Sequence, residues 1–308
     1  MAKTVLELRN VSKTFGKRKV IDNISLEIRE GEIYGFLGPN GSGKTTTIKM
    51  ILRLIDMDSG EIKVNGYDNK KQFEKAMECI GAIVENPDMY QYMSAVDNLK
   101  LHTRIRNIDN KRIDEVLELV GLKGREKDKV GKYSLGMKQR LGLALTLLHK
   151  PKVLILDEPT NGLDPAGIKQ LRDILKEIAH KEKVAVFVSS HILSEMQLMC
   201  DKVAVIDNGK VVKTQNVKQD IDKEETEKVE LRTIETEKAN QIIKEKFGIE
   251  SQLIEDSIEI TVKSKILPEI VKELAINDVG IKAVIPKEHT LEDIFFDATK
   301  GGKNNEDI

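Results

Sequence analysis

The fold of this chain is decided by residues 38–45, which read Gly38-Pro39-Asn40-Gly41-Ser42-Gly43-Lys44-Thr45 and fit the pattern G-x-x-x-x-G-K-[ST]. A strand-like run at residues 33–37 leads directly into them. Glycines let successive backbone N–H groups point into one cavity, and a helix that begins near Lys44 would aim its positive end at that cavity. An ordinary strand-to-helix turn needs one or two glycines and no Lys-Thr pair. The stretch therefore predicts a phosphate-binding loop.

The same stretch assigns roles in binding a nucleotide. Lys44 would reach the β- and γ-phosphates, and the hydroxyl of Thr45 would be a ligand of Mg²⁺. The residues expected to contact the nucleotide here are Gly38, Pro39, Asn40, Gly41, Ser42, Gly43, Lys44, Thr45 and Thr46.

The bulk composition is that of a soluble protein, with 40% hydrophobic and 33% charged residues. A length of 308 residues suggests about two domains. The net charge of −1 provides no basic field, so we expect no nucleic-acid partner. Cys79 and Cys200 lie far apart and outside any metal-ligand spacing, which indicates reduced thiols.

Membrane segments are not expected in this sequence. No stretch approaches the roughly 20 apolar residues that a spanning helix needs, and the first residues contain no apolar run typical of a signal peptide. We therefore expect a cytoplasmic protein, and any role at a membrane must come through a partner.

A second nucleotide motif is the apolar run at residues 153–156, which is closed by Asp157 and Glu158. Such a run suits a strand that is covered on both faces of a parallel sheet. Asp157 would hold Mg²⁺, and Glu158 would polarise the attacking water. A buried strand followed by ordinary turn acids is the alternative, and the presence of the glycine loop argues against it.

Three more motifs follow in a fixed order. Residues 133–140 read Tyr-Ser-Leu-Gly-Met-Lys-Gln-Arg ahead of an apolar helix, residues 159–164 read Pro-Thr-Asn-Gly-Leu-Asp, and Ser-Ser-His at 189–191 closes a second apolar strand. Over about residues 3–220, this set resembles the ATP-binding subunits of ABC transporters. The resemblance implies an ATPase with ATP and Mg²⁺ as cofactors.

The resemblance also implies a homodimer through the nucleotide-binding domains, arranged head to tail, in which a signature helix meets the partner's ATP. Here the signature departs from the usual Leu-Ser-Gly-Gly-Gln. The hydroxyl of Ser134 and the N–H groups of the helix start would bond the γ-phosphate, and Gln139 would supply an amide. Taken alone, the stretch is a helix cap. The signature residues expected in trans are Ser134, Leu135, Gly136, Met137 and Gln139.

Three further roles rest on the resemblance. His191 matches the switch histidine that orients the attacking water, although a lone histidine after a strand is more often structural. Asp164 matches the aspartate of the loop that connects the two ATP sites. Phe15 matches the aromatic residue that stacks on adenine, with a place in a minor core as its alternative.

Glu85 follows an apolar, strand-like run at residues 80–84. It is the main departure from the family pattern, which has Gln at the end of this strand. A carboxylate is a good ligand for Mg²⁺, so Glu85 is expected as a third metal ligand with Thr45 and Asp157. A third acid beside Asp157 and Glu158 should raise the pKa of at least one of them and destabilise the site before Mg²⁺ binds, because like charges repel. The activity should then depend more steeply on Mg²⁺ and on pH.

The stretch around Glu85, together with residues 133–140 and 157–165, resembles the bacitracin-export and lantibiotic-immunity transporters.

The region after Glu85 is where the resemblance places contact with an integral membrane permease. Residues 89–93 include two tyrosines and two methionines, side chains that adapt to a partner surface. Packing inside the helical insert is the alternative. The protein would then lie on the inner face of the cell membrane through its permease.

The expected architecture is an α/β P-loop domain at residues 1–220, with a mixed core sheet, an antiparallel β subdomain and a helical subdomain at about 86–150. Residues 221–300 show the order βαββαβ of a small ferredoxin-like accessory domain, closed by an amphipathic helix around Leu291, Ile294 and Phe295. Residues 301–308 are expected to be a disordered tail.

Two other classes of protein stay open. A soluble ABC ATPase of translation carries two nucleotide domains, and one of DNA repair carries a long coiled-coil insert, neither of which is present here. A sensor that binds ATP without hydrolysing it is disfavoured by intact Lys44, Asp157, Glu158 and His191.

Overall fold

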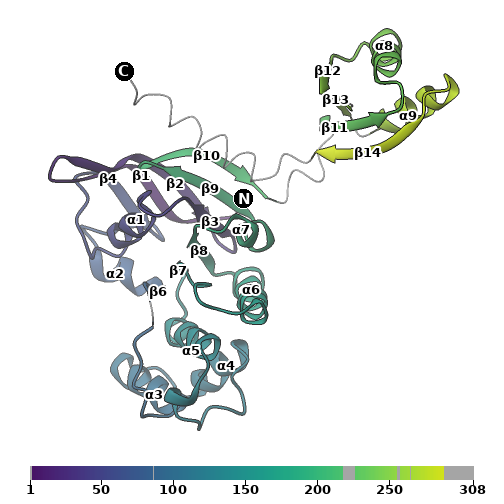
Figure 1. The fold of residues 1–308 in the computed structure, drawn as a ribbon. Helices are drawn as coiled ribbons and strands as arrows, with labels where there is room; N and C mark the ends of the chain where they lie inside the picture. Colours follow the sequence, from purple (N-terminus) through teal and green to yellow (C-terminus); the bar gives the residue numbers. More distant parts are fainter. Residues whose placement is uncertain (1, 86, 218–225, 255–256, 264, 288–308) are drawn as a thin grey trace. The chain divides into compact units, whose positions relative to one another are not determined.

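The computed structural model of the chain describes residues 2–85, 87–217, 226–254, 257–263 and 265–287. These residues form two compact units that divide between Val217 and Lys218 (Figure 1). Each unit has its own hydrophobic core. No helix within the described ranges is both long and apolar enough to cross a membrane.

The first unit is built on a six-stranded sheet with the order β10-β9-β3-β8-β7-β6. Its strands run parallel except β10, which is antiparallel to β9. Every residue of β3, β7 and β8 is buried, as expected of parallel strands covered on both faces. The strands are β3 (Ile33–Leu37), β6 (Ile80–Ile83), β7 (Val153–Asp157), β8 (Ala185–Ser190), β9 (Lys202–Asp207) and β10 (Lys210–Asn216).

The antiparallel β subdomain is confirmed as a four-stranded sheet with the order β2-β1-β4-β5. Its apolar residues share one core with helix α1 and with β7 of the larger sheet. This shared core fixes the start of α1, and therefore the phosphate loop, against both sheets. The elements are β1 (Thr4–Phe15), β2 (Arg18–Arg29), β4 (Ser59–Val64), β5 (Tyr67–Asp68) and α1 (Lys44–Ile51).

Helices α3, α4 and α5 form a group next to β6 (Figure 1), inside the range expected for the helical subdomain. The predicted capping pair of α3 is confirmed, because the Ser94 hydroxyl accepts a hydrogen bond from the Asp97 N–H (3.1 Å) and donates one to the Asp97 carboxylate (2.6 Å). The remaining elements are α2 (Phe73–Glu78), α3 (Ala95–Arg106), α4 (Lys111–Leu119), the 3₁₀ helix η1 (Val130–Lys132), α5 (Leu135–Leu147), α6 (Pro165–His180) and α7 (Leu193–Met199).

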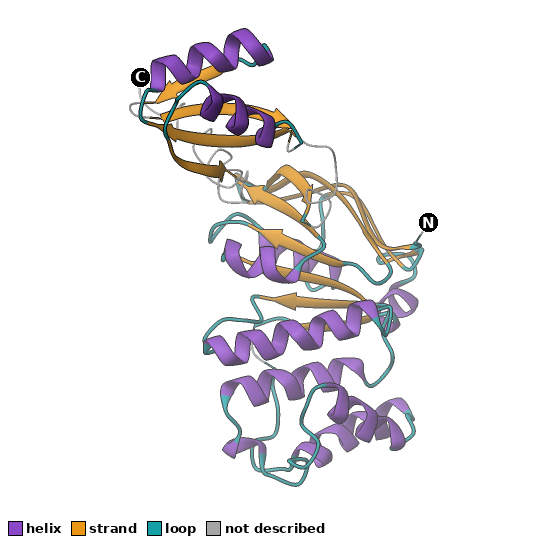
Figure 2. Ribbon diagram, turned by 90° about the vertical axis from the view of Figure 1, so that its right-hand side faces the viewer, coloured by secondary structure: helices purple, strands orange, loops and turns teal. Residues whose placement is uncertain are grey.

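The second unit confirms the predicted βαββαβ order. Its antiparallel sheet has the order β12-β13-β11-β14, and both helices lie on one face of it (Figure 2). The elements are β11 (Thr226–Thr233), α8 (Thr236–Phe247), β12 (Ser251–Ile254), β13 (Ser257–Lys263), α9 (Leu267–Ile276) and β14 (Ile281–Lys287). The expected closing helix around residues 291–295 and the tail at 301–308 lie outside the described residues.

Candidate nucleotide site

The phosphate loop leaves β3 and enters α1 at Lys44. Gly43 precedes the helix with φ of 111°, a conformation that glycine adopts at little cost. A Cβ atom on Gly38 would lie 2.3 Å from the carbonyl oxygen of Ile206, so no side chain fits there. The Lys44 ammonium donates to the carbonyl oxygens of Gly38 (2.8 Å) and Pro39 (3.2 Å). The loop therefore curls around the Lys44 side chain.

Other side chains of the loop offer polar atoms to a ligand. The Ser42 hydroxyl is buried and has no hydrogen-bond partner among the described residues. Thr45 and Thr46 are half-buried in the first turn of α1, and Asn40 and Gly41 are at or near the surface. A buried hydroxyl without a partner is costly, and a bound phosphate would satisfy it.

Asp157 and Glu158 lie at the carboxyl end of β7 and are joined by Ser189 of the neighbouring strand. The Ser189 hydroxyl, fully buried, donates to Oδ1 of Asp157 (2.6 Å) and accepts from the backbone N–H of Glu158 (3.0 Å). Glu158 has φ of 49°, so the chain turns sharply between the two acids. The two carboxylates have different partners, because Asp157 accepts from Ser189, whereas Glu158 contacts Lys44 and His191.

Glu158 connects the phosphate loop to the predicted switch histidine. Its Oε1 lies 3.2 Å from Nζ of Lys44, and its Oε2 lies 2.7 Å from Nδ1 of His191. A carboxylate can only accept, so Nδ1 of His191 is the donor and carries the proton. The loop, the β7 acids and the histidine therefore meet in one cluster.

A cation such as Mg²⁺ fits the oxygen donors of this cluster. Asp157 is only 5% exposed, and no Lys, Arg or His of the described chain forms an ion pair with it. A buried carboxylate without a positive partner is unfavourable. The described residues contain no group of three His, Cys, Asp or Glu side chains that could hold a metal ion. Mg²⁺ uses one or two carboxylates with phosphate oxygens and water, so the donors available from Thr45 and Asp157 suit it.

In this structure the Glu85 side chain lies apart from these acids and is exposed, and its expected role as a third metal ligand stays a prediction. Glu85 has φ of 65°, its side chain is 76% exposed, and its Oε1 lies 3.9 Å from Nζ of Lys49. The left-handed turn directs the carboxylate to solvent and to α1. The backbone alone is close to the site, because β6 pairs with β7 at Ile83 and Leu156.

The signature residues begin helix α5. The Ser134 hydroxyl caps the helix by accepting a hydrogen bond from the Met137 N–H at 3.3 Å, and Ser134 and Leu135 are exposed. Gly136 follows them in the first turn. Gln139 instead lies on the buried face and is 4% exposed, so an amide contact to a nucleotide in trans would require it to leave this position.

Asp164 and Phe15 have contacts outside the cluster. The Asp164 carboxylate caps α6 by accepting from the Gly167 N–H at 2.8 Å. Phe15 ends β1 and is 48% exposed, which excludes a place in a minor core. Nζ of Lys13 lies 5.3 Å from the centroid of its ring, so one side of the ring already faces a cation.

Ser189 contacts both acids, and the sequence did not single it out. It was visible only as part of the Ser-Ser-His stretch, where it served to locate His191. The Thr160 hydroxyl, also not anticipated, donates to Glu195 at 2.5 Å and ties the loop after Glu158 to helix α7. Neither position has a pattern in the sequence that identifies its partner.

A family model described as ABC transporter matches residues 21–161. The chain is 39% identical to a bacitracin transport ATP-binding protein of Bacillus licheniformis, over 97% of this chain and 98% of the relative. The chain belongs to the ABC transporter ATP-binding proteins. Members of this family hydrolyse ATP, so this chain is an ATPase.

Two further likenesses agree with this family. A lantibiotic transport ATP-binding protein of Streptococcus pyogenes is 41% identical over 68% of this chain and 89% of its own length. Among solved structures, a Clostridium perfringens component of an ABC transporter complex shares 26% identity with a TM-score of 0.65, covering 71% of this chain and 90% of that one. The predicted resemblance to bacitracin and lantibiotic transport ATP-binding proteins is confirmed.

Proposed function

We propose that this ABC ATPase is the subunit that powers a separate membrane permease in the export of a peptide antibiotic. The observation that carries the proposal is the likeness over nearly the whole chain, 97%, to a bacitracin transport ATP-binding protein. In this proposal the protein is cytoplasmic and is held at the inner face of the cell membrane by its permease.

The residues of the ATPase site divide the work of hydrolysis. Lys44 binds the β- and γ-phosphates at the mouth of the curled loop, with help from the N–H groups at the start of α1. Glu158 polarises the attacking water. His191 positions the Glu158 carboxylate through the hydrogen bond of 2.7 Å between Nδ1 of His191 and Glu158. Thr45 and Asp157 would hold Mg²⁺, which would offset the negative charge of the phosphates.

Because Lys44 forms an ion pair with Glu158, the γ-phosphate of ATP must compete with Glu158 for Lys44. Both side chains are largely buried, at 6% and 17% exposure, so neither charge is well solvated. A γ-phosphate that attracts Lys44 weakens its hold on Glu158 and leaves that carboxylate to accept from water and His191. Binding of ATP is thereby linked to preparation of the general base.

ATP-dependent dimerisation completes each site in the proposal. The exposed start of α5, at Ser134 and Leu135, offers a hydroxyl and free N–H groups to the γ-phosphate of a second copy. Asp164 at the start of α6 belongs to the loop between the two sites, and Phe15 offers one face to adenine.

The loop after Glu85 is the proposed contact with the permease. Tyr90 and Tyr92 are 54% and 72% exposed, and their rings meet edge to face with centroids 5.8 Å apart. Asn98, buried in α3, accepts from the Tyr90 N–H (2.9 Å) and donates to the Tyr90 carbonyl oxygen (3.1 Å). A rigid, exposed aromatic pair supports a docking role. Substitution of Tyr90 and Met93 by Asp should stop transport while ATP hydrolysis by the free subunit continues.

The experiment that tests the proposal is mass spectrometry of the proteins that co-purify with tagged Glu158→Gln chain from its native host, in mild detergent with ATP and Mg²⁺. A polytopic membrane protein in the eluate, together with bacitracin or lantibiotic sensitivity when the ATPase is deleted, is the expected result. Ribosomes, DNA-processing proteins or no membrane protein would favour a soluble ABC ATPase or an ATP-binding sensor instead.

A further inference from the structure

A hydrogen bond between two side chains joins the segments that follow Glu158 and His191. The Thr160 hydroxyl donates to Oε2 of Glu195 at 2.5 Å. Thr160 is only 4% exposed, and Glu195 is half-buried. A short hydrogen bond to a carboxylate is of the strong, charge-assisted kind, and burial of the donor limits its replacement by water. The contact therefore fixes the loop after Glu158 to helix α7.

The loop after Glu158 is held at its first residue by the neighbouring strand. The N–H of Glu158 lies within hydrogen-bond distance of both the carbonyl oxygen (3.2 Å) and the hydroxyl (3.0 Å) of Ser189. Beyond it, the Asn161 N–H donates to the Glu158 carbonyl oxygen at 3.2 Å. The Leu163 N–H donates to the Thr160 carbonyl oxygen at 3.1 Å. Because this loop is short and hydrogen-bonded, a displacement of Thr160 is transmitted to Glu158.

His191 lies between strand β8 and helix α7. On the strand side, the Ser190 hydroxyl accepts a hydrogen bond from the Ile192 N–H at 2.9 Å, across the histidine. On the helix side, α7 begins at Leu193, so Glu195 stands in its first turn. The backbone at His191 is therefore set from both sides, by the end of β8 and by the start of α7.

The two segments also meet inside the cluster around Glu158. Nδ1 of His191 donates to Oε2 of Glu158 at 2.7 Å. Two side-chain contacts thus close one ring of chain, formed by residues 158–160 and 191–195. We call this arrangement the contact ring. Opening it between Thr160 and Glu195 leaves the contact of Glu158 with His191 without this support.

We propose that Thr160 and Glu195 are positioning residues, which close the contact ring and so hold Nδ1 of His191 against the Glu158 carboxylate. The inference rests on the roles in hydrolysis proposed for Glu158 and His191. The His191 side chain is 39% exposed, so water competes for its ring and other rotamers are open to it. Fixing the backbone on both sides of His191 reduces this freedom and favours the contact with Glu158.

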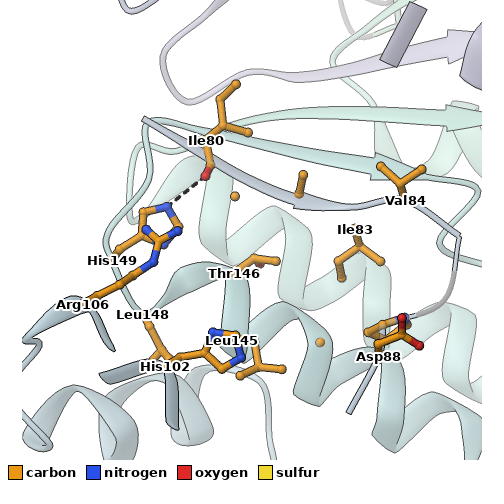
Figure 3. Close-up of a pocket in the computed structure, with 14 residues that line it drawn as sticks. Ile80, Ile83, Val84, Asp88, His102, Arg106, Leu145, Thr146, Leu148 and His149 are labelled. Atoms are coloured by element: carbon orange, nitrogen blue, oxygen red, sulfur yellow. Dashed lines mark hydrogen bonds between the residues drawn. The ribbon is translucent and has the colours of Figure 1, made fainter. Parts of the chain in front are cut away.

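The first measurement is the tautomer of His191, read from the ¹⁵N shifts of the ring nitrogens in histidine-labelled full chain without nucleotide. At about pH 8 an ordinary imidazole is neutral. The proton of His191 is then expected on Nδ1, which donates to Glu158. His149 is an internal reference of the opposite kind, because its Nε2 lies 2.9 Å from the carbonyl oxygen of Ile80 and must be the donor (Figure 3). His191→Gln assigns the His191 signals.

Four variants open or keep the contact ring. Thr160→Val keeps the size of the side chain without the hydroxyl, and Glu195→Ala removes the acceptor. Both should move the His191 signals away from the Nδ1–H form and leave those of His149 unchanged. Thr160→Ser keeps the hydroxyl and should restore the signals of the unmodified chain. The double variant Thr160→Val/Glu195→Ala should be no worse than either single variant, because the two residues act through one contact.

The same variants are then assayed for ATP hydrolysis. In Thr160→Val, kcat should fall about tenfold or more, because a hydrogen bond to a charged group is lost and the general base is less well held. The KM for ATP should change less than about twofold, since Lys44 and the phosphate loop are untouched. If Thr160→Val proves too unstable to purify, Glu195→Ala carries the test, with Glu195→Gln, whose amide oxygen still accepts, as its control.

The outcomes separate this inference from the proposed function. An unchanged His191 tautomer in both Thr160→Val and Glu195→Ala, with or without a loss of kcat, would overturn the inference. Additive losses in the double variant would overturn it too, since the two residues would then act independently. Full hydrolysis by Glu158→Gln would instead count against the proposed role of Glu158, whereas the tautomer of His191, measured without nucleotide, would still report on the contact ring.

Discussion

The Nζ atom of Lys44 lies 3.2 Å from Oε1 of Glu158, so the residue proposed to bind phosphate and the residue proposed to activate water share one ion pair. With exposures of 6% and 17%, this pair is partly desolvated, and its electrostatic interaction is stronger than that of a surface pair. ATP must compete with Glu158 for Lys44. The Lys44–Glu158 contact therefore couples the affinity for ATP to the availability of the Glu158 carboxylate as a general base.

Glu158→Gln separates these two effects. The variant keeps the size of the side chain but removes the charge that holds Lys44, so we expect ATP to bind at least as tightly as in the unmodified chain. Turnover should fall by about a hundred- to ten-thousand-fold, because the general base is lost. Titration with a fluorescent ATP analogue and phosphate-release assays measure the two quantities. Weaker ATP binding in the variant would contradict the competition described here, and undiminished hydrolysis would remove Glu158 from the mechanism.

Ser189→Ala tests whether the buried hydroxyl positions both acids. Without it, Asp157 loses its hydrogen bond of 2.6 Å, and the N–H of Glu158 loses its side-chain acceptor at 3.0 Å. A hydrogen bond to a charged group contributes about 1.5–3 kcal/mol, so the Mg²⁺ concentration for half-maximal ATPase activity should rise about tenfold or more.

Two variants control for a general loss of stability at this position. Ser189→Thr keeps the hydroxyl and should restore most of the Mg²⁺ response. Ser190→Ala removes the neighbouring hydroxyl, which accepts from the Ile192 N–H at 2.9 Å, and should leave the Mg²⁺ response near that of the unmodified chain. If all three variants shift Mg²⁺ dependence equally, Ser189 has no special positioning role.

The sequence predicts those parts of the site that are formed by one continuous stretch of residues. The phosphate loop and the Asp157–Glu158 pair each need only a strand, a turn and neighbouring side chains, and the structure places them together as expected. Ser189 could not be found in this way, because all six residues of β8 are buried. Because buried and exposed residues do not alternate along β8, the residues around Ser189 do not indicate which side of the strand faces Asp157.

The directions of the Gln139 and Glu85 side chains could not be predicted from the sequence. Helix α5 is apolar over most of its surface, so its pattern does not reveal that Gln139 lies on the buried face. The left-handed conformation of Glu85, with φ of 65°, is rare for a residue other than glycine. A glutamate at this position therefore does not predict it. At both positions the direction of the side chain depends on packing between segments far apart in the sequence.

Glu85→Gln should leave the Mg²⁺ dependence of ATP hydrolysis unchanged. The carboxylate of Glu85 faces Lys49 at 3.9 Å and is 76% exposed, and an exposed pair of this kind contributes little. Magnesium titrations of ATPase activity in both proteins provide the measurement. A lower Mg²⁺ requirement in the variant would show that Glu85 turns toward Asp157 during catalysis and that the three acids do repel.

His149 makes the first unit sensitive to acid. Burial and, secondarily, the charge of Arg106 lower its pKa in the folded protein, while the hydrogen bond to the carbonyl oxygen of Ile80 opposes this shift. The unfolded chain, with a histidine pKa of about 6.5, therefore binds the proton more readily than the folded chain. Linkage then requires that stability is full above about pH 6.5 and falls as the pH drops below it.

His149→Gln removes this titration and can still donate a hydrogen bond to Ile80. We expect the free energy of unfolding, measured by denaturant titration at pH 7.5 and pH 5.5, to fall less between the two pH values in the variant than in the unmodified chain. His180→Gln is a suitable control, because His180 contacts the Asp201 carboxylate at 3.1 Å rather than a neutral carbonyl. Equal loss of stability in the His149 variant and the unmodified chain would mean that other groups govern the response to acid.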